Sequence, residues 1–371
     1  MNKKTKILLL GPLPPPYHGV SVFTELLSES KELKKHLNLF TFNTTSKQNL
    51  EEVGRFSLKK IFQNIKIIYN FKKIIKKINP DIVYLPISQS KSGFLRDGFF
   101  ILLSNKNSKK IIHLHGGNFH NLYNNSNMLF KKFINTVLKR VNKAIVLGES
   151  LKPVFKKWFK DNEIFVLYNG IKIQDHNLKA NRDKNKIIIG YLGNLYKEKG
   201  FTDILIVFNE LSEKYNNIEF HFAGEWFQPD LQQEIMEFII LNDLKSKVRF
   251  HGFLTGRDKE EFLLNTDIFV FNSYLNEGQP LVLLEALAKG CAIVSTNVGA
   301  IRETIQDQTN GFLIKPKDRY DLKQKIEILI KDEKLRKTMG EKSIEIFKNK
   351  FTFEHVEKNI IKIFNKTLEK Q

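Results

Sequence analysis

Two glutamates in one short span are the side chains of this sequence most suited to chemistry. Glu277 stands just before Gly278 and Pro280, and Glu285 follows a few residues later, ahead of Gly290. Pro280 suits the first turn of a helix, where an N–H would have no partner, and Gly290 suits its end. Glu277 is therefore expected in the loop before this helix and Glu285 inside it. The free N–H groups at the helix start favour an anion, and Gly278 lets a ligand approach the backbone, so a phosphorylated ligand fits.

A second group of candidates ends a predicted strand in the first half of the chain. His115 follows the apolar residues of this strand and precedes two glycines. The carboxyl ends of parallel strands are where open α/β sheets bind ligands, so an imidazole there can reach a substrate. His113, on the same side of the strand, is expected to pack in the sheet. A metal site is the alternative, but no Cys or acidic residue nearby completes one.

Two glycine loops lead from a predicted strand into a predicted helix. The first contains Gly19, and the second contains Gly193 and Lys199. Loops of this kind can cradle a phosphate. The alternative for Gly19 is a proline-braced turn in which glycine supplies an unusual backbone angle. The alternative for Lys199 is an ordinary surface lysine.

Alternating strands and helices are expected to position these loops, in the pattern of doubly wound parallel sheets. The chain of 371 residues is long enough for two domains, and its 42% hydrophobic and 27% charged content is typical of a globular protein. The strands expected in the first half are 6–10, 37–42, 81–85, 110–114, 144–147 and 164–167. The strands expected in the second half are 186–192, 219–223, 248–253, 268–271, 291–296 and 311–314. The late helices expected are 321–330, 335–347 and 352–368.

The spacing around the two glutamates resembles the signature of retaining glycosyltransferase family 4. Glu277-Gly-x-Pro-x-x-x-x-Glu285-Ala-x-Ala-x-Gly290 is followed by an apolar strand and by Gly299-Ala-Ile-Arg-Glu303. The resemblance covers essentially the whole chain and implies the GT-B fold. In that fold two Rossmann-like, doubly wound domains face each other across a cleft, and the C-terminal helix crosses back to the first domain.

The expected domains follow from this resemblance and from the polar stretch after Asn169-Gly170. Residues 1–170 would form an N-terminal Rossmann-like domain that faces the acceptor and the membrane, and 171–185 would be a linker. Residues 186–350 would form the Rossmann-like domain that binds the nucleotide sugar. Residues 351–371 would be the crossover helix.

The resemblance also implies a role for each matching residue of the central motif. Glu277 would touch the donor sugar, and Glu285 would bind the ribose hydroxyls. The backbone amides at Gly278 and Leu281 would hold the diphosphate. The alternative is that the two acids are a loop residue and a solvated helix residue, but the glycines and Pro280 in register argue against it.

Other positions match the family in part. Gly19 would lie beside the donor diphosphate, although His18 stands where the family usually has a first glycine. Lys199 would reach the diphosphate, whereas Asn194 replaces the usual arginine and can donate a hydrogen bond without supplying charge. His115 would approach the donor sugar and diphosphate. The residues expected in base-contacting loops are Gly224 and Phe253.

The activity implied is that of a retaining, metal-independent glycosyltransferase of the hexosyltransferase type. It would move a sugar from a nucleotide-diphosphate-sugar donor to an acceptor hydroxyl, with the donor as co-substrate and with no other cofactor. No Asp-x-Asp stretch lies in a plausible site, which argues against the metal-dependent transferases. A nucleotide-sugar epimerase or a phosphorylase on a related fold remains an alternative, as does a basic nucleic-acid-binding protein, although no nucleic-acid module accompanies the charge.

Positive charge is concentrated in the first half of the chain. Residues 1–170 hold 29 Lys and Arg against 10 Asp and Glu, and residues 171–371 hold 31 against 30. Residues 58–78 place apolar residues at helical spacing among seven lysines with no acid, and 129–143 and 153–160 repeat the combination. One interpretation of residues 58–78 is an ordinary helix that covers the sheet and exposes a basic face to solvent. Reversible docking of the first domain on anionic lipid is a second hypothesis, and it is compatible with the first.

The expected partners follow from these features. They are a nucleotide-sugar donor, a glycan or lipid-linked acceptor as in bacterial surface polysaccharide biosynthesis, and an anionic membrane surface, with no specific nucleic acid. No apolar run approaches the roughly 18 residues that span a bilayer, so the expected location is cytoplasmic and peripheral at the inner face of the cell membrane. The single cysteine, Cys291, suits a reducing compartment and is expected to pack in the core.

Overall fold

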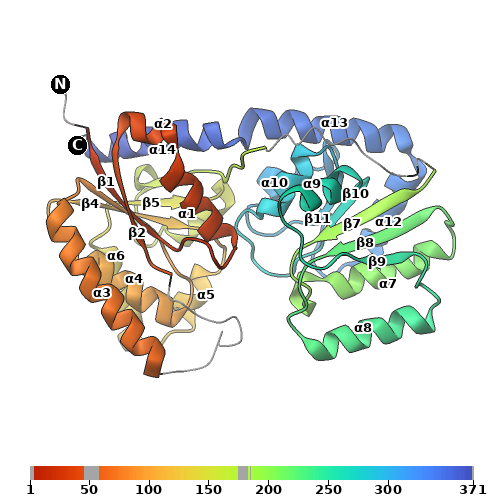
Figure 1. The fold of residues 1–371 in the computed structure, drawn as a ribbon, viewed down its shortest axis with the longest axis horizontal. Helices are drawn as coiled ribbons and strands as arrows, with labels where there is room; N and C mark the ends of the chain where they lie inside the picture. Colours follow the sequence, from red (N-terminus) through yellow and green to blue (C-terminus); the bar gives the residue numbers. More distant parts are fainter. Residues whose placement is uncertain (1–3, 46–57, 174–182, 184, 370–371) are drawn as a thin grey trace. The chain divides into compact units, whose positions relative to one another are not determined.

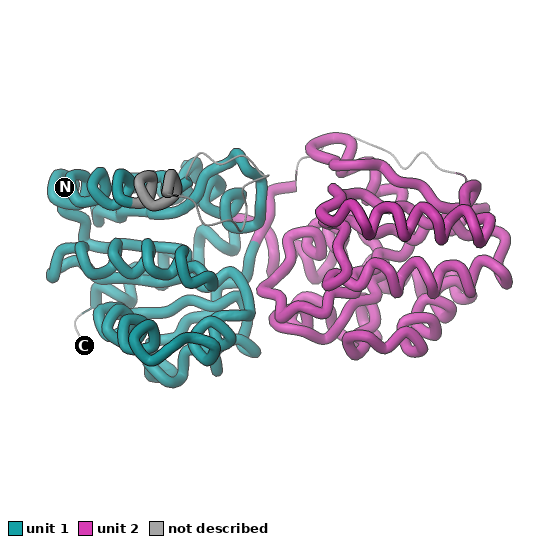
Figure 2. Tube along the Cα trace, turned by 90° about the horizontal axis from the view of Figure 1, so that it is seen from below, with its two compact units in different colours: residues 1–169, 354–371 teal, residues 170–353 magenta. Residues whose placement is uncertain are grey.

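The computed structural model describes residues 4–45, 58–173, 183 and 185–369, and the chain divides into two compact units. Unit 1 consists of Met1–Asn169 and Glu354–Gln371, and unit 2 consists of Gly170–Phe353 (Figure 2). The linker expected at 171–185 falls largely outside the described residues. Among the described helices, none is both long enough and apolar enough to cross a membrane.

Unit 1 is built on a six-stranded parallel sheet in the order β2-β1-β3-β4-β5-β6. Its inner strands are continuous apolar runs, as expected for strands that are covered on both faces; Ile7 to Leu10 of β1 are fully buried. The strands of unit 1 are β1 (Lys6–Gly11), β2 (Asn38–Asn43), β3 (Ile82–Pro86), β4 (Lys109–Leu114), β5 (Lys143–Val146) and β6 (Ile164–Val166).

The helices of unit 1 cover the two faces of this sheet according to the direction of each crossover. Parallel strands are joined by right-handed crossovers. The connection from β1 to β2 runs toward one edge of the sheet, whereas the connections from β2 to β3, β3 to β4 and β4 to β5 run toward the other edge. Because all of them are right-handed, α1 covers one face of the sheet and α3, α4 and α6 cover the other (Figure 1). The helices are α1 (Gly19–Glu29), α2 (Lys31–His36), α3 (Leu58–Ile78), α4 (Lys91–Leu103), α5 (Phe119–Asn124), α6 (Met128–Leu138), η2 (Glu149–Val154) and η3 (Asp161–Glu163).

The last helix, α14 (Phe353–Leu368), belongs almost entirely to unit 1. Phe364 packs edge-on against Tyr84 of β3, with 5.9 Å between ring centroids. Ser30, the N-cap of α2, donates to the buried Glu357 carboxylate at 2.5 Å. The return of the C-terminal helix to the first unit is therefore confirmed.

Unit 2 has a second six-stranded parallel sheet, in the order β12-β11-β10-β7-β8-β9. The first strand, β7, lies between β8 and β10, so the chain winds outwards from the centre in both directions, and the doubly wound α/β architecture is confirmed in both units. The strands are β7 (Ile187–Leu192), β8 (Ile218–Ala223), β9 (Val248–Phe250), β10 (Ile268–Phe271), β11 (Ala292–Thr296) and β12 (Gly311–Ile314). The helices are η4 (Lys197–Lys199), α7 (Phe201–Ser212), α8 (Pro229–Leu241), α9 (Gly256–Leu264), α10 (Leu281–Ala288), α11 (Ile301–Thr304), α12 (Arg319–Lys331) and α13 (Glu333–Lys350).

Two details differ from the sequence-based expectation. The strand expected at 248–253 ends at Phe250, because Gly252 has a φ of +67°, which an extended strand cannot contain. Pro280 is the N-cap of α10 rather than a residue of its first turn, with an extended ψ of 126°. The helix itself begins at Leu281, so the loop before it is one residue longer than expected.

Candidate active site

The loop between β10 and α10 carries Glu277. The Glu277 carboxylate accepts a hydrogen bond from Ser273 Oγ at 2.6 Å, and the Ser273 hydroxyl also lies 3.2 Å from the N–H of Leu275, which donates to it. Tyr274, in the same loop, bonds to the Asp203 carboxylate of α7, and its N–H donates to the Glu198 carbonyl at 2.9 Å. These contacts fix the loop to the sheet and to the neighbouring β7–α7 connection, so Glu277 is held in a defined position.

Lys199 meets Glu277 directly. Lys199 ends η4, after the glycine loop that follows β7, and its Nζ forms an ion pair with Glu277 Oε1. Both side chains are largely buried, each with 16% of its surface exposed, and the Lys199 ammonium also lies 5.2 Å from the centre of the Phe271 ring. The two residues meet because β7 and β10 are neighbours, so the loops at their carboxyl ends share one edge of the sheet.

This ion pair explains how both charges tolerate partial burial without a ligand. A buried charge that loses its partner is strongly destabilised. An incoming diphosphate would give Lys199 a second anionic partner, and it would then free Glu277 to face a sugar. The site can therefore exchange one acidic partner of the lysine for another.

Gly299 presses against the backbone of the same loop. Its φ is +54°, and a Cβ at this position would lie 1.7 Å from the Glu277 carbonyl oxygen. The next residue, Ala300, donates its N–H to the Gly278 carbonyl at 3.2 Å. Glycine is required here because only a residue without a side chain can combine this backbone angle with this approach.

Helix α10 starts immediately after this loop, with no side chain capping its N-terminus. Gly278 is buried, and Leu281 is the first helical residue. The first N–H groups of a helix have no partner within it, so this end of α10 offers donors and a positive dipole end. Lys199 therefore pairs with an acid that lies only four residues before the start of α10.

Glu285 lies on the second turn of α10 and is bound to a lysine that the sequence did not single out. Lys259 of α9 donates from Nζ to Glu285 Oε1 at 2.6 Å. The other carboxylate oxygen, Oε2, is buried and has no hydrogen-bond partner among the described residues. Nothing in the sequence around Lys259 indicates this contact, because it depends on how α9 packs beside α10.

The remaining residues expected at the donor site occupy other loops of unit 2. Asn194 is exposed, and its carbonyl accepts from the Tyr191 hydroxyl at 3.0 Å. Gly224 is buried, and a Cβ there would lie 1.9 Å from the Gly193 carbonyl oxygen, so its first role is to let two loops pack closely. Phe253 is 55% exposed. Contacts of these residues with a donor stay predictions.

In unit 1, Gly19 is the first residue of α1, and a Cβ there would have no neighbour within 4 Å. Its φ is not positive, so the alternative that this glycine supplies an unusual backbone angle is wrong. His18 is the N-cap: its Nδ1 accepts from the Ser21 N–H at 3.3 Å, and the Ser21 hydroxyl accepts from the His18 N–H at 3.0 Å. The histidine that replaces the family glycine therefore has a structural task, and Gly19 leaves open space beside it.

His115 follows β4 and packs against α1. Its ring centroid lies 4.8 Å from that of Phe23 and 3.9 Å from that of His113. Burial lowers the pKa of His115 to about 3, with a smaller contribution from His18. The ring is therefore neutral near pH 7. Its Nε2 is buried and has no hydrogen-bond partner among the described residues.

His113 packs within the sheet, as expected. The residue is fully buried, and its Nδ1 is 2.5 Å from the Tyr84 hydroxyl. Burial lowers the pKa of His113 well below its ordinary value, with His115 adding to the effect. Within the described ranges, no group of three His, Cys, Asp or Glu side chains is arranged to hold a metal ion.

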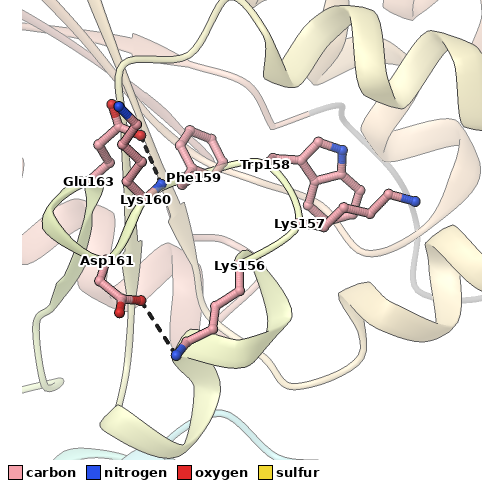
Figure 3. A pocket seen from close by; sticks show the side chains of 7 residues that line it. All are labelled: Lys156, Lys157, Trp158, Phe159, Lys160, Asp161 and Glu163. Carbon is pink, nitrogen blue, oxygen red and sulfur yellow. Dashed lines mark hydrogen bonds and ion pairs between the residues drawn. The ribbon is translucent and has the colours of Figure 1, made fainter.

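A shallow hollow in unit 1 is lined by a different set of residues (Figure 3). It is lined by 156–161 and Glu163, in the segment around η3. Lys156 pairs with Asp161 at 3.5 Å, and the Lys160 N–H donates to Glu163 Oε2 at 2.9 Å. None of the expected site residues lines the hollow, so it is not the candidate active site.

Comparison with known proteins assigns unit 2 to a family. The sequence model of the family "Glycosyl transferases group 1" matches residues 173–346, which include Lys199, Glu277 and Glu285. The matched region is a group 1 glycosyltransferase domain. In the structure, this group 1 domain carries the ion pair and the uncapped helix described above.

Relatives and solved structures are similar to this chain over most of its length. An uncharacterized glycosyltransferase of Methanocaldococcus jannaschii is 26% identical over 368 residues, covering 94% of this chain and 90% of the relative. The capsular polysaccharide biosynthesis glycosyltransferase CapM of Staphylococcus aureus is 26% identical over 259 residues, covering 65% and 67%. The Anabaena protein HepE, solved in complex with UDP and glucose, has the same fold, with a TM-score of 0.70, 16% identity, and coverage of 98% and 100%.

Proposed function

We propose that this group 1 glycosyltransferase transfers a sugar from a nucleotide-diphosphate donor to an acceptor hydroxyl, with retention at the anomeric carbon. The observation that carries the proposal is the Lys199–Glu277 pair beside the uncapped start of α10. A lysine and free helix N–H groups suit a departing diphosphate, and an acid suits the positive charge that develops on the sugar ring. HepE, a neighbour in fold, binds UDP and glucose, which supports a donor of this class.

In the proposed reaction, the bond between the anomeric carbon and the diphosphate oxygen breaks, and its electron pair stays on the diphosphate. Lys199 and the amides near Gly278 and Leu281 stabilise that charge. The acceptor oxygen forms the new bond to the anomeric carbon, and its proton passes to the departing diphosphate oxygen. Glu277, freed from Lys199, stabilises the ring in the transition state, where such interactions have most effect.

Other residues would bind the donor. Glu285 would accept hydrogen bonds from the ribose hydroxyls, and Lys259 would hold its carboxylate in place. Asn194 would donate to the diphosphate, and the loops at Gly224 and Phe253 would lie at the base. His115 would offer a neutral imidazole to the sugar, consistent with its buried and unpartnered Nε2.

The reaction is proposed to need no metal ion and no cofactor, because a lysine and helix dipoles would supply the positive charge that a metal supplies elsewhere. Transfer that continues at full rate in excess chelator is expected. Loss of transfer in chelator, restored by one divalent cation, would contradict this part of the proposal.

The acceptor is proposed to be a lipid-linked glycan of bacterial surface polysaccharide biosynthesis. The relative CapM acts in capsular polysaccharide biosynthesis, and the first half of this chain holds nearly all of its excess positive charge. Unit 1 would dock on the anionic inner face of the cell membrane, and the enzyme would be cytoplasmic and peripheral. Lysines near an anionic surface contribute about 1 kcal/mol each.

A panel of nucleotide sugars tests the donor. One of them is expected to raise the melting temperature and to be hydrolysed slowly without acceptor. Product analysis with an acceptor should then show transfer with retention. Absence of stabilisation by every nucleotide sugar, or epimerisation without transfer, would contradict the proposal.

A further inference from the structure

The helices α3, α4 and α6 form one continuous layer on a single face of the unit 1 sheet (Figure 1). Aromatic contacts join them in order. Phe71 of α3 lies 4.9 Å from Phe100 of α4, and Phe99 of α4 lies 6.0 Å from Phe133 of α6, measured between ring centroids. The outward side of this layer, here called the α3–α4–α6 face, is therefore one surface.

Apolar side chains stand on this face without covering. Met128 and Leu129, in the first turn of α6, are 86% and 79% exposed. Leu95 and Phe99 continue the pattern on α4 at helical spacing from the exposed Lys91. On α3, Ile65 and Tyr69 are also exposed. Isolated apolar residues on a surface are ordinary, but a set on three packed helices indicates an interaction site.

The charge on the same face has one sign. Its lysines are Lys66, Lys72, Lys73, Lys76, Lys77, Lys91, Lys131 and Lys132. Within the described part of the chain, none of them forms an ion pair with an acid, whereas many lysines of unit 2 do, among them Lys214 and Lys331 with Glu327. The sole acid on the three helices is Asp97, which is fully buried and bound by Arg96 at 2.8 Å.

We infer that the α3–α4–α6 face docks on an anionic bilayer, with Met128 and Leu129 inserted among the lipids and the lysines at the headgroups. The inference rests on the membrane docking proposed above and specifies the face and the anchoring residues. Unpaired lysines match an anionic surface in charge. A soluble polyanion would match the lysines equally well, but it would leave two large apolar side chains in water, so the bilayer is the better occupant.

Helix direction relates this face to the proposed chemistry within unit 1. Met128 and Leu129 begin α6, which follows α5 in the connection from β4 to β5, and the same connection contains His115. Helices that follow parallel strands start at the carboxyl edge of the sheet, where ligands bind. The inserted Met128 and Leu129 would therefore lie toward the sheet edge from which His115 emerges, and a lipid-linked acceptor would be near that edge.

Sedimentation with vesicles tests the inference, using the full chain. The wild-type protein is expected to bind vesicles of equal parts phosphatidylcholine and phosphatidylglycerol, and not phosphatidylcholine alone. The Met128→Ser/Leu129→Ser double variant should bind at least about tenfold more weakly. Ile240→Ser/Leu241→Ser is the matched control, because these residues are 55% and 84% exposed on α8 of unit 2, and it should bind like wild type.

Binding to long-chain polyphosphate, a soluble polyanion, is measured to distinguish docking on a bilayer from binding of a soluble polyanion. Lys131→Gln/Lys132→Gln should weaken binding to both polyphosphate and anionic vesicles, whereas the Met128/Leu129 variant should keep its polyphosphate binding. Equal vesicle binding by that variant and wild type would overturn the inference, as would equal wild-type binding to neutral and anionic vesicles. Nucleotide-sugar stabilisation, measured without vesicles, should be unchanged in all variants, so failure of docking and failure of the proposed donor chemistry are distinguishable.

A fluorophore provides a second readout that does not depend on affinity. Cys291 is the single cysteine of the chain and is buried, so Leu129→Cys can be labelled selectively. A polarity-sensitive dye at 129 should shift to shorter wavelength on anionic vesicles, and the same dye on Leu241→Cys should not. No shift at 129 in vesicle-bound protein would show that this residue stays in water and would overturn the insertion.

Discussion

Replacing Gly299 with alanine tests whether the position of Glu277 controls the reaction. The added Cβ would lie 1.7 Å from the Glu277 carbonyl oxygen and 2.7 Å from its carbonyl carbon, both of them backbone atoms. Ordinary non-bonded contacts are about 3.5 Å, so the Glu277 loop must move by roughly 1.5 Å or more. A misplacement of about 1 Å at a reacting group costs on the order of 10²-fold in rate. We therefore expect about a hundredfold loss in kcat/KM for transfer.

A matched control isolates the displacement from backbone strain. Gly256 has a φ of +51°, close to the +54° of Gly299, but a Cβ there meets nothing within 4 Å. An alanine in this left-handed region costs about 1–2 kcal/mol at either position. Gly256→Ala should lose about that much stability in urea unfolding and keep its activity, whereas Gly299→Ala should lose more stability because it adds the steric clash. Near-normal transfer by Gly299→Ala, or an equal loss in both variants, would refute the reasoning.

Three further predictions concern the charged and titrating residues. Glu277→Gln should lower the rate of transfer about 10²–10³-fold. Its binding of nucleoside diphosphate, measured by calorimetry, should be as tight as that of wild type or tighter, because Lys199 loses its internal partner; normal turnover would contradict the assignment. Glu285→Ala should chiefly raise the dissociation constant for the nucleotide, and Lys259→Met should act in the same direction with a smaller effect; a loss confined to kcat would be inconsistent with a ribose contact. Burial lowers the pKa of His115 to about 3, so as the pH falls the unfolded chain binds the proton first, and the stability that the neutral ring contributes is lost progressively from about pH 6.5 toward pH 3. The free energies of unfolding of wild type and His115→Asn, plotted against pH, should converge over that range, and parallel plots would contradict the prediction.

The sequence predicted most of the fold because parallel strands buried on both faces are continuous apolar runs, as in 6–10 and 268–271. The boundaries follow local signals such as Gly290 and the cap at Asp332, which accepts from the Leu335 N–H at 2.8 Å. The strand expected to reach Phe253 was too long because the positive φ of Gly252 is not visible in its residue type. Apolar runs and capping residues therefore predict the helices and strands, whereas the backbone angle of an individual glycine cannot be predicted from its residue type.

The candidate site was predictable residue by residue, but its contacts were not. Glu277 and Lys199 each stood out in a motif, yet their ion pair depends on β7 lying next to β10, and strand order is not written in either motif. Lys259 carried no signal, since its partner is on another helix. The lysine-rich segment 58–78 predicted a basic helix, but the exposure of Met128 and Leu129 beside it depends on tertiary packing.

We expect the diphosphate of a sugar donor to replace Glu277 as the partner of Lys199. A crystal structure with the most strongly stabilising nucleotide sugar tests this directly. Diphosphate oxygens should lie within hydrogen-bond distance of Lys199 Nζ and of the backbone at the start of α10, with the Glu277 carboxylate turned to the sugar. A donor bound elsewhere while the Lys199–Glu277 pair stays intact would contradict it.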